Sequence, residues 1–456
     1  MNQSLIEKIL DYAVSHGGDF AEVFYEDTEK SDILLFGEKI LNCSSGRERG
    51  VGIRIFSGLQ STYLHTSDCS EKGIFQLMSS WNGGKGTIPR ESFSVDRKTG
   101  KGQKHFWEKA GMERKLEMMR RGICAGKDTD SAITQMRAKY IDMDQWVTIA
   151  NTEGVFVRDH RMKTRLHLTA YAEADGECQT SYVGPGAMKG FEFYDQIDVE
   201  AYARKAAMSA KALLHAKPCP TGRMPVVIGN GFGGLFFHEA CGHSLEASSV
   251  AKNASEFCGK IGEKVASEKV TLIDDGSMEG HWGSLGIDDE GESVRKNVLI
   301  EHGVLKGYMI DRLNGQRMQM EPTGSARREN YRFAPTSRMT NTYIAPGDDS
   351  VEKIIGGVEH GIYVKSINAG SVLPSTGEFN FNTSETFLIE HGEITVPVHS
   401  ATLIGTGGDI LKKVDMVGTD YEIGQGFCYA ASGALYISAG QPTVRVSEMT
   451  VGGDAS

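Results

Sequence analysis

Two histidines around a glutamate are the feature that most constrains how this 456-residue chain folds. Glu239 directly follows His238, and His243 lies five residues after His238 in a segment that is typical of an apolar helix. In a regular α-helix, side chains five residues apart point roughly 140° away from each other, too far to share one metal ion. Gly242 directly precedes His243, and glycine permits a π-bulge or an abrupt helix end. We therefore predict that the helix widens or ends there.

Two imidazoles and a carboxylate in this arrangement favour hydrolytic metal chemistry. A catalytic zinc ion is held by neutral imidazole nitrogens, keeps one position open for water, and has a carboxylate nearby that takes the proton of that water. His238 and His243 are therefore candidate metal ligands, and Glu239 is the candidate general base. The alternative is two unrelated histidines in a core helix, which a lone pair at this spacing would favour.

A glycine-rich turn precedes the histidines. Residues 225–228 are predicted to form a strand, and the glycines in 229–234 satisfy the dinucleotide-binding pattern G-x-G-x-x-G. A nucleotide-binding unit would continue into a second parallel strand, whereas residues 244–260 are predicted to form a polar loop. We expect instead that Gly231 and Gly233 let an extended peptide approach the backbone beside the metal, or let the helix pack closely on its strand.

Composition argues against several other classes of protein. The formal net charge of −11 argues against a nucleic-acid partner, because phosphate binding draws on clustered positive charge. The first residues alternate charged and apolar side chains and lack the uncharged core of a signal peptide. No apolar stretch approaches the roughly 20 residues of a membrane helix, and the eight cysteines form neither a disulfide framework nor a C-x-x-C pair. We expect a cytoplasmic protein without a nucleic-acid or membrane partner.

Residues 85–121 carry a dense run of positive charge. Its basic residues are Lys85, Arg90, Arg97, Lys98, Lys101, Lys104, Lys109, Arg114, Lys115, Arg120 and Arg121. Glutamate and glycine interrupt the run, which favours a solvated helix and loop, with a basic groove for RNA or DNA as the alternative. We assign this stretch no functional role.

Turn residues and periodicity predict the remaining elements. Apolar residues at helical spacing predict a first helix that ends at Gly17. Alternating segments at 21–25, 33–36 and 50–56 predict strands of an antiparallel sheet packed by helices. A helix predicted over 199–215 leads out of a central strand-rich region. The pattern is that of an α+β fold rather than of repeated βαβ units.

A domain boundary is expected near residue 220, where two prolines break the last of these helices and the chain becomes glycine-rich. We predict three domains: an N-terminal α+β domain (1–82), a central domain with the basic stretch and the connecting helix (83–219), and a β-rich C-terminal domain that carries the histidine helix (220–456).

Further motifs follow the histidine helix in a fixed order. The blocks span 238–243, 288–291, 297–308, 322–324, 327–329, 338–343, 379–385, 401–405, 415–418, 426–428, 440–443 and 449–453. In these blocks the chain resembles the TldD/PmbA family of metallopeptidases, and specifically its TldD branch, whose H-E-x-x-x-H signature matches residues 238–243. The resemblance is dense from Pro220 onward and thinner before it.

The resemblance implies a third metal ligand, because the family has a cysteine near its C-terminus that matches Cys428. Two histidines and one thiolate would leave a fourth position for water, which is the coordination of a catalytic zinc ion, one per catalytic chain. Cys241 is the competing candidate, since it lies three residues after His238 on roughly the same helical face. The other cysteines are expected to be buried, reduced thiols.

The family also implies a function. Its members hydrolyse flexible or unfolded peptides and small proteins, in precursor maturation or degradation, inside a chamber between two subunits. The substrate would be bound in extended form as an added strand. The partner would be a TldE/PmbA-like subunit or a second copy of this chain. The alternative is a non-catalytic regulatory or scaffold protein with a structural zinc site.

Four polar residues in the matched blocks are further candidates for substrate binding. They are Asp288, Glu290, Arg338 and Asn341. Their clustering indicates a cleft wall or a subunit contact, and ordinary salt bridges are the alternative.

Overall fold

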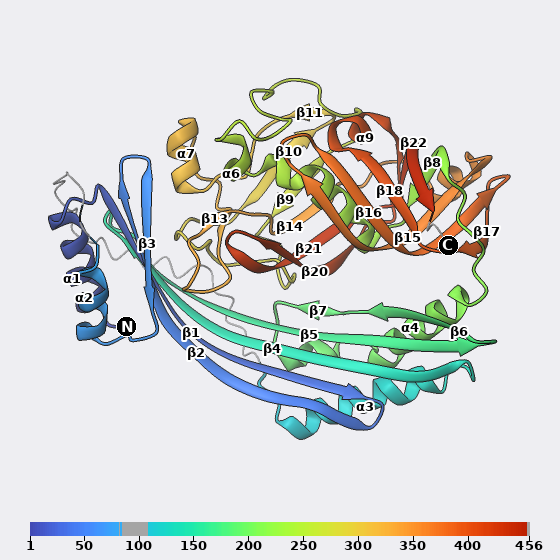
Figure 1. Ribbon diagram of the computed structural model, residues 1–456, viewed down its shortest axis with the longest axis horizontal. Helices are drawn as coiled ribbons and strands as arrows, with labels where there is room; N and C mark the ends of the chain where they lie inside the picture. Colours follow the sequence, from blue (N-terminus) through green and yellow to red (C-terminus); the bar gives the residue numbers. More distant parts are fainter. Residues whose placement is uncertain (82, 84–107, 454–456) are drawn as a thin grey trace.

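The computed structural model describes residues 1–81, 83 and 108–453, and it shows a long curved sheet beneath a C-terminal lobe (Figure 1). The sheet follows the order β3-β2-β1-β4-β5-β6, and β7 pairs with β5. Its strands are β1 (Phe20–Phe36), β2 (Lys39–Ser57), β3 (Gln60–Thr66), β4 (Ile133–Asn151), β5 (Phe156–Ala174), β6 (Glu177–Val183) and β7 (Gly186–Ala187). The predicted α+β fold class is confirmed.

Strand β1 is longer than its sequence pattern predicted. Residues 21–25 and 33–36 were expected to form separate strands, but both lie in β1, together with the polar residues between them. β1 pairs with β2 on one side and with β4 on the other through these polar residues. Backbone hydrogen bonds to both neighbouring strands therefore set the length of β1. The alternation of apolar and polar side chains marks only its two ends.

Helices cover the two ends of this sheet. At one end, α1 (Gln3–Ser15) and α2 (Glu71–Met78) bury apolar side chains against β1 and β2. At the other end, α3 (Met112–Lys127) and α4 (Val199–Leu213) pack on β4 and β5. The predicted first and connecting helices are α1 and α4. Strands from both sides of residue 82 thus share one sheet, because β1 pairs directly with β4.

The basic stretch is described only in part. Lys85, Arg90, Arg97, Lys98, Lys101 and Lys104 lie outside the described residues. Of the remainder, Lys115 forms an ion pair with Asp142, and Arg121 forms one with Glu200. These basic side chains hold α3 to its neighbours.

The C-terminal lobe contains a closed ring of strands and a second sheet. The ring follows β15-β8-β22-β18-β16 and is closed by pairing of β15 with β16; β17 and β19 are attached to it. Its strands are β8 (Gly222–Ile228), β15 (His360–Leu373), β16 (Glu378–Glu390), β17 (Glu393–Val398), β18 (Ala401–Thr406), β19 (Val414–Val417) and β22 (Val444–Gly453).

The second sheet of this lobe runs in the order β11-β10-β9-β14-β21-β20, which places β20 at its edge. Its strands are β9 (Leu272–Asp275), β10 (Lys296–Glu301), β11 (Val304–Leu305), β14 (Asn341–Ile344), β20 (Glu422–Ala430) and β21 (Gly433–Gln441). The short pair β12 (Ala326–Arg327) and β13 (Thr336–Ser337) and the helices α7 (Arg312–Met318), α8 (Val351–Gly356) and α9 (Gly407–Lys413) also belong to the lobe. One continuous apolar core joins the ring to the second sheet.

Buried ion pairs join the long sheet to the C-terminal lobe. Arg328 lies 2.6 Å from Glu22 of β1, and Arg161 of β5 lies 2.7 Å from Asp289, with all four side chains almost fully buried. Breaking such a pair leaves an uncompensated buried charge, which costs about 3–5 kcal/mol. These contacts therefore fix the position of the sheet relative to the lobe. No helix within the described residues is long and apolar enough to span a membrane.

Candidate metal centre

The helix that carries the histidines widens where the sequence predicts. A 3-10 turn, η2 (Gly231–Gly234), leads into α5 (Leu235–Phe237), then into the π turn η3 (His238–Gly242) and the 3-10 turn η4 (His243–Leu245). A π turn hydrogen-bonds from residue i to i+5, so residues five apart overlie each other. The rings of His238 and His243 consequently lie with their centroids 5.3 Å apart.

Gly242 permits this turn by its size rather than by an unusual backbone angle. Its φ of −58° is ordinary for a helix. A β-carbon at this position would collide with the sulfur of Met339. Any larger residue would therefore have to displace the buried side chain of Met339, whereas glycine fits beside it.

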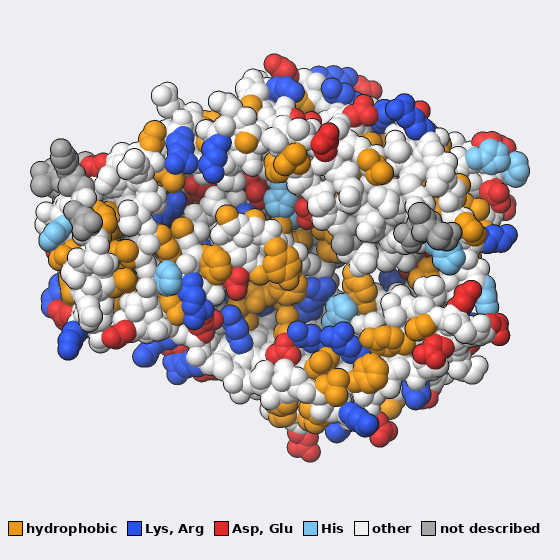
Figure 2. Space-filling model, viewed as in Figure 1, with side chains coloured by type: hydrophobic (Ala, Val, Ile, Leu, Met, Phe, Trp, Pro, Cys, Tyr) orange, Lys and Arg blue, Asp and Glu red, His pale blue; other side chains and the backbone are white. Residues whose placement is uncertain are grey.

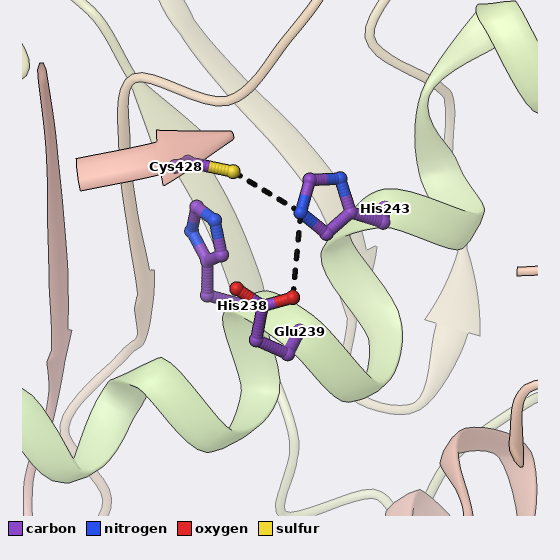
Figure 3. A group of neighbouring side chains, drawn as sticks. All are labelled: His238, Glu239, His243 and Cys428. Carbon is purple, nitrogen blue, oxygen red and sulfur yellow. Dashed lines mark hydrogen bonds and ion pairs between the residues drawn. The ribbon is translucent and has the colours of Figure 1, made fainter. Parts of the chain in front are cut away.

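Strand β20 brings Cys428 to the two histidines. The Sγ atom of Cys428 lies 3.2 Å from Nε2 of His243, and a carboxylate oxygen of Glu239 lies 3.5 Å from the same nitrogen. Figure 3 shows the two rings and the thiol pointing toward one another, with Glu239 beside them. One ligand atom from each of these four residues lies within 4.8 Å of the others.

The donor set fits a metal ion. His238 is fully buried, and neither of its ring nitrogens has a hydrogen-bond partner among the described residues. A buried polar group without a partner costs about 1–3 kcal/mol, so such a group requires an explanation. Burial also holds the pKa of His238 well below its ordinary value. A neutral imidazole with a free nitrogen is the form that binds a metal.

Cys241 occupies a different position from Cys428. Both are buried, but within the described part of the chain only Cys428 belongs to the group formed with His238 and His243. Burial raises the pKa of the Cys241 thiol well above its ordinary value. The geometry therefore distinguishes the two cysteines that the sequence left as competing candidates.

Glu246 and Arg338 support these residues from behind. A carboxylate oxygen of Glu246 lies 3.1 Å from Nδ1 of His243, and Nε of Arg338 lies 3.6 Å from the other oxygen of Glu246. Arg338 also donates a hydrogen bond of 3.0 Å to the backbone carbonyl of Cys428. Burial by itself lowers the pKa of His243, but Glu246 and Cys428 hold that pKa well above its ordinary value.

Sequence reasoning missed Glu246, because residues 244–260 were predicted to form a polar loop. Residues 244–250 instead enter the core, where α6 (Ala247–Val250) follows directly after Glu246, while residues 251–260 form turns and loop as predicted. The available signal was a carboxylate three residues after His243, a spacing that places two side chains on one face of a helix.

Three of the four residues, Glu239, His243 and Cys428, line a cleft of about 1280 Å³, together with residues of β5, β6, α4, β15, β16 and β20. Figure 2 shows the hollow between the long sheet and the C-terminal lobe. Glu239 is partly exposed beside it, while His238, His243 and Cys428 are buried. A substrate in the cleft would therefore meet the carboxylate beside the side chains of His243 and Cys428.

The two candidate glycines have different surroundings. Gly231 lines the cleft and has a φ of +70°, which favours glycine. Gly233 is buried, and a β-carbon there would lie 3.1 Å from the side chain of Ile228 in β8. Gly231 thus lies where an extended peptide could approach it, and Gly233 lies where the helix packs on its strand.

The other candidate residues are buried inside the protein. None of Asp288, Glu290, Arg338 and Asn341 is among the described residues that line the cleft. Asp288 accepts hydrogen bonds from the backbone of Glu290 and Glu292, and Glu290 forms an ion pair with Arg54 of β2. Asn341 donates to the backbone carbonyl of Asp275. Their contacts hold loops and lobes together.

Comparison with known proteins finds matches along most of the chain. The first domain, the central domain and the C-terminal domain of the PmbA/TldA metallopeptidases match residues 21–80, 107–214 and 221–453. A Haemophilus influenzae protein named metalloprotease TldD homolog is 34% identical over 98% of this chain and 95% of its own length. The chain belongs to the PmbA/TldD family of metallopeptidases. A protein of Methanothermobacter thermautotrophicus named metalloprotease is 31% identical over 95% of this chain and 96% of its own length.

Solved structures show the same fold. TldE from Thermococcus kodakarensis superposes with a TM-score of 0.78 at 19% identity, over 98% of this chain and 100% of that one. A Thermotoga maritima protein described as a candidate modulator of a DNA gyrase also gives a TM-score of 0.78, at 21% identity over 99% of this chain and 100% of its own. The relatives named as metalloproteases support a metallopeptidase, and the cluster around His238 is a candidate site for its metal.

Proposed function

We propose that this chain is a zinc-dependent peptidase that hydrolyses peptide bonds in flexible or unfolded peptides and small proteins, in precursor maturation or degradation. One observation carries the proposal: two imidazoles and a thiol from distant parts of the chain converge beside a carboxylate at the cleft. The relatives named as metalloproteases support it.

His238, His243 and Cys428 would hold one zinc ion per chain. Imidazole and thiolate are donors that suit zinc, and three protein ligands leave the fourth position open, as in catalytic sites. When bound, the ion supplies Lewis acidity for water and for the scissile carbonyl. Glu246 would orient His243 by accepting a hydrogen bond from Nδ1, which leaves Nε2 free to act as a donor to the ion.

Glu239 would act as the general base. Burial raises the pKa of its carboxyl group, so this glutamate takes up a proton more readily than a solvated one does. It lines the cleft beside His243, within reach of a water molecule that attacks a bound peptide. In the proposed reaction Glu239 takes the proton of that water and passes it to the leaving amine.

The peptide would lie in extended form along β20. This strand is at the edge of its sheet, and all of it from Glu422 to Ala430 lines the cleft. A peptide that is added to a sheet edge is recognised mainly through its backbone, and pockets for alternate side chains add specificity. Gly231, which lines the cleft beside Glu422 of this strand, would allow close approach.

The proposed setting is the cytoplasm, and the proposed partner is a TldE/PmbA-like subunit or a second copy of this chain. The likeness of the fold to a solved TldE supports an assembly of this type. A non-catalytic regulator or scaffold with a structural zinc site would have no use for a glutamate at the mouth of a cleft. The position of Glu239 therefore favours the peptidase.

The test compares zinc content and peptide cleavage for the wild type and Glu239→Gln, with and without a candidate partner subunit. An unstructured peptide mixture is followed by mass spectrometry. We expect both proteins to bind about one zinc ion per chain and the variant to lose cleavage on the order of 10²–10⁴-fold. Zinc-loaded wild type that cleaves nothing, even with a partner, would overturn the proposal.

Thermal melting of His238→Ala separates a catalytic ion from a structural one. A structural zinc site contributes folding energy directly, so its loss unfolds the chain. We expect His238→Ala to lose zinc but to keep most of the stability of the zinc-loaded wild type.

A further inference from the structure

One cation in the wall of the cleft has no acidic partner in the described part of the chain. Arg165 of β5 lines the cleft and is partly buried, and it forms no ion pair among the residues that the structure describes. Its Nε donates to the carbonyl of Gly184 at 3.1 Å, and its Nη2 donates to the carbonyl of Gln425 at 2.8 Å. Both hydrogen-bond partners are neutral, so no carboxylate of the described residues neutralises the guanidinium.

The surroundings of Arg165 are poor in solvent. Its guanidinium carbon lies 5.6 Å from the ring centroid of Phe427 and 5.9 Å from that of Trp282. Burial lowers the pKa of Arg165 to about 10, which is the direction expected for a cation without a nearby anion. Buried charges in proteins are usually paired, so an unpaired one at a cleft wall indicates a ligand that brings the opposite charge.

The other basic side chains of the cleft differ from Arg165. Lys365 is already paired with Glu385. Lys205 is exposed, so water screens its charge. Figure 2 shows basic side chains along the lower margin of the hollow. Of these three basic residues that line the cleft, only Arg165 is partly buried and lacks an acidic partner among the described residues.

The position of Arg165 along β20 sets the place of the anion. Its Nη2 contacts Gln425, which lies three residues before Cys428 on that strand. Three residues of an extended chain span about 10 Å. A peptide that runs beside β20 with its scissile bond near Cys428 would place a side chain or chain end about three residues away next to Arg165.

We propose that Arg165 is a specificity-determining residue that binds a carboxylate of the peptide, about three residues from the bond that is cleaved. This inference rests on the proposed peptidase function. The carboxylate belongs either to a Glu or Asp side chain or to the C-terminus of the peptide, and guanidinium recognises both in the same way. Peptides without a carboxylate at that distance would be poorer ligands.

The test measures binding rather than cleavage, so that its outcome is separate from that of the proposed function. The zinc-loaded Glu239→Gln protein is titrated with fluorescent ten-residue peptides that differ in one feature. One set has glutamate or glutamine at each position in turn, with an amidated C-terminus. A second set has no acidic side chain and ends in a free carboxylate or an amide.

We expect at least tenfold tighter binding of peptides with a suitably placed carboxylate, and the set that shows this preference identifies its source. Arg165→Met in the same background should abolish the preference, and Arg165→Lys should keep part of it. Lys205→Met is the matched control, and it should keep at least half of the preference for acidic peptides.

If Glu239→Gln binds acidic and neutral peptides equally, the proposal is wrong. It is equally wrong if Arg165→Met weakens both kinds alike, since Arg165 would then only support β20. Cleavage of the same peptides by the wild type tests the peptidase function independently.

Discussion

Glu246 lies 3.1 Å from Nδ1 of His243, on the opposite side of the ring from Cys428. The carboxylate contacts Nδ1, so Nε2 is the nitrogen that faces the thiol and Glu239. Arg338 contacts Glu246 and the backbone of Cys428, so one buried guanidinium links two of the proposed ligands. Glu246 and Arg338 therefore support the proposed ligands His243 and Cys428, and the spacing of the histidines does not reveal this support.

Glu246→Gln should weaken zinc binding by about 10–100-fold, because loss of such a supporting carboxylate usually has that effect. Competition of the protein with a chromogenic chelator measures the affinity. Glu422→Gln changes another carboxylate of the cleft and serves as the control, which should stay within about threefold of the wild type by the same argument. Equal losses in both variants would show that general cleft charge, rather than contact with His243, holds the ion.

Cys428→Ser should abolish stoichiometric metal binding, and Cys241→Ser should retain it, because only Cys428 points toward the two histidines. Cobalt offers a direct readout, since a thiolate ligand gives a charge-transfer absorption band that a hydroxyl does not. The band should be present in Cys241→Ser and absent from Cys428→Ser. The reverse pattern would identify Cys241 as the ligand.

Gly242→Ala should destabilise the protein by about 1–3 kcal/mol, because the added methyl group collides with Met339 and overpacks a filled core. It should also lower zinc affinity, since the π turn must shift to make room. Thermal melting and chelator competition measure the two effects. Adding Met339→Ala removes the colliding side chain and should restore part of the zinc affinity, although it leaves a cavity. If the double variant regains no zinc affinity, the loss in Gly242→Ala comes from a change in backbone conformation rather than from the collision with Met339.

Ionisation of Glu26 should lower the free energy of unfolding as pH rises from about 4.5 to about 6. Burial raises the pKa of its carboxyl group from 4.5 to about 6. The folded state therefore holds the proton more tightly than the unfolded state does. The stabilisation from protonated Glu26 is fully present below the pKa of Glu26 in the unfolded state. It is lost as pH rises through the higher pKa of the folded state. A shift of this size corresponds to about 2 kcal/mol.

Urea midpoints at about pH 4.5 and about pH 6.5 measure the effect. Glu26→Gln stays neutral and can still accept the backbone N–H of Tyr331, with Gln145 beside it. Other groups titrate in the same range, so the informative quantity is the difference between wild type and variant. If both lose the same stability over this interval, Glu26 is not the group responsible.

Local features could be predicted from the sequence, because local sterics and hydrogen bonding decide them. The spacing of His238 and His243 together with Gly242 predicted a widened helix, and the structure has a π turn there. The first helix and the helix over 199–215 were likewise recognised from their periodicity. The two short strands at 21–25 and 33–36 were not recognised as one, because pairing with β2 and β4 extends β1 through polar residues.

The sequence by itself determined that two imidazoles and a carboxylate would lie in one short helical segment, and Gly242 indicated the widening that brings residues five apart together. Only the tertiary structure decided which thiol joins them. Cys428 is 185 residues from His243 and reaches it through the register of β20 on β21. The tertiary structure also placed Glu246 and Arg338 behind the site, and it left Arg165 in the cleft without an acidic partner among the residues that the structure describes. Such contacts arise from packing between distant segments, which no local pattern records.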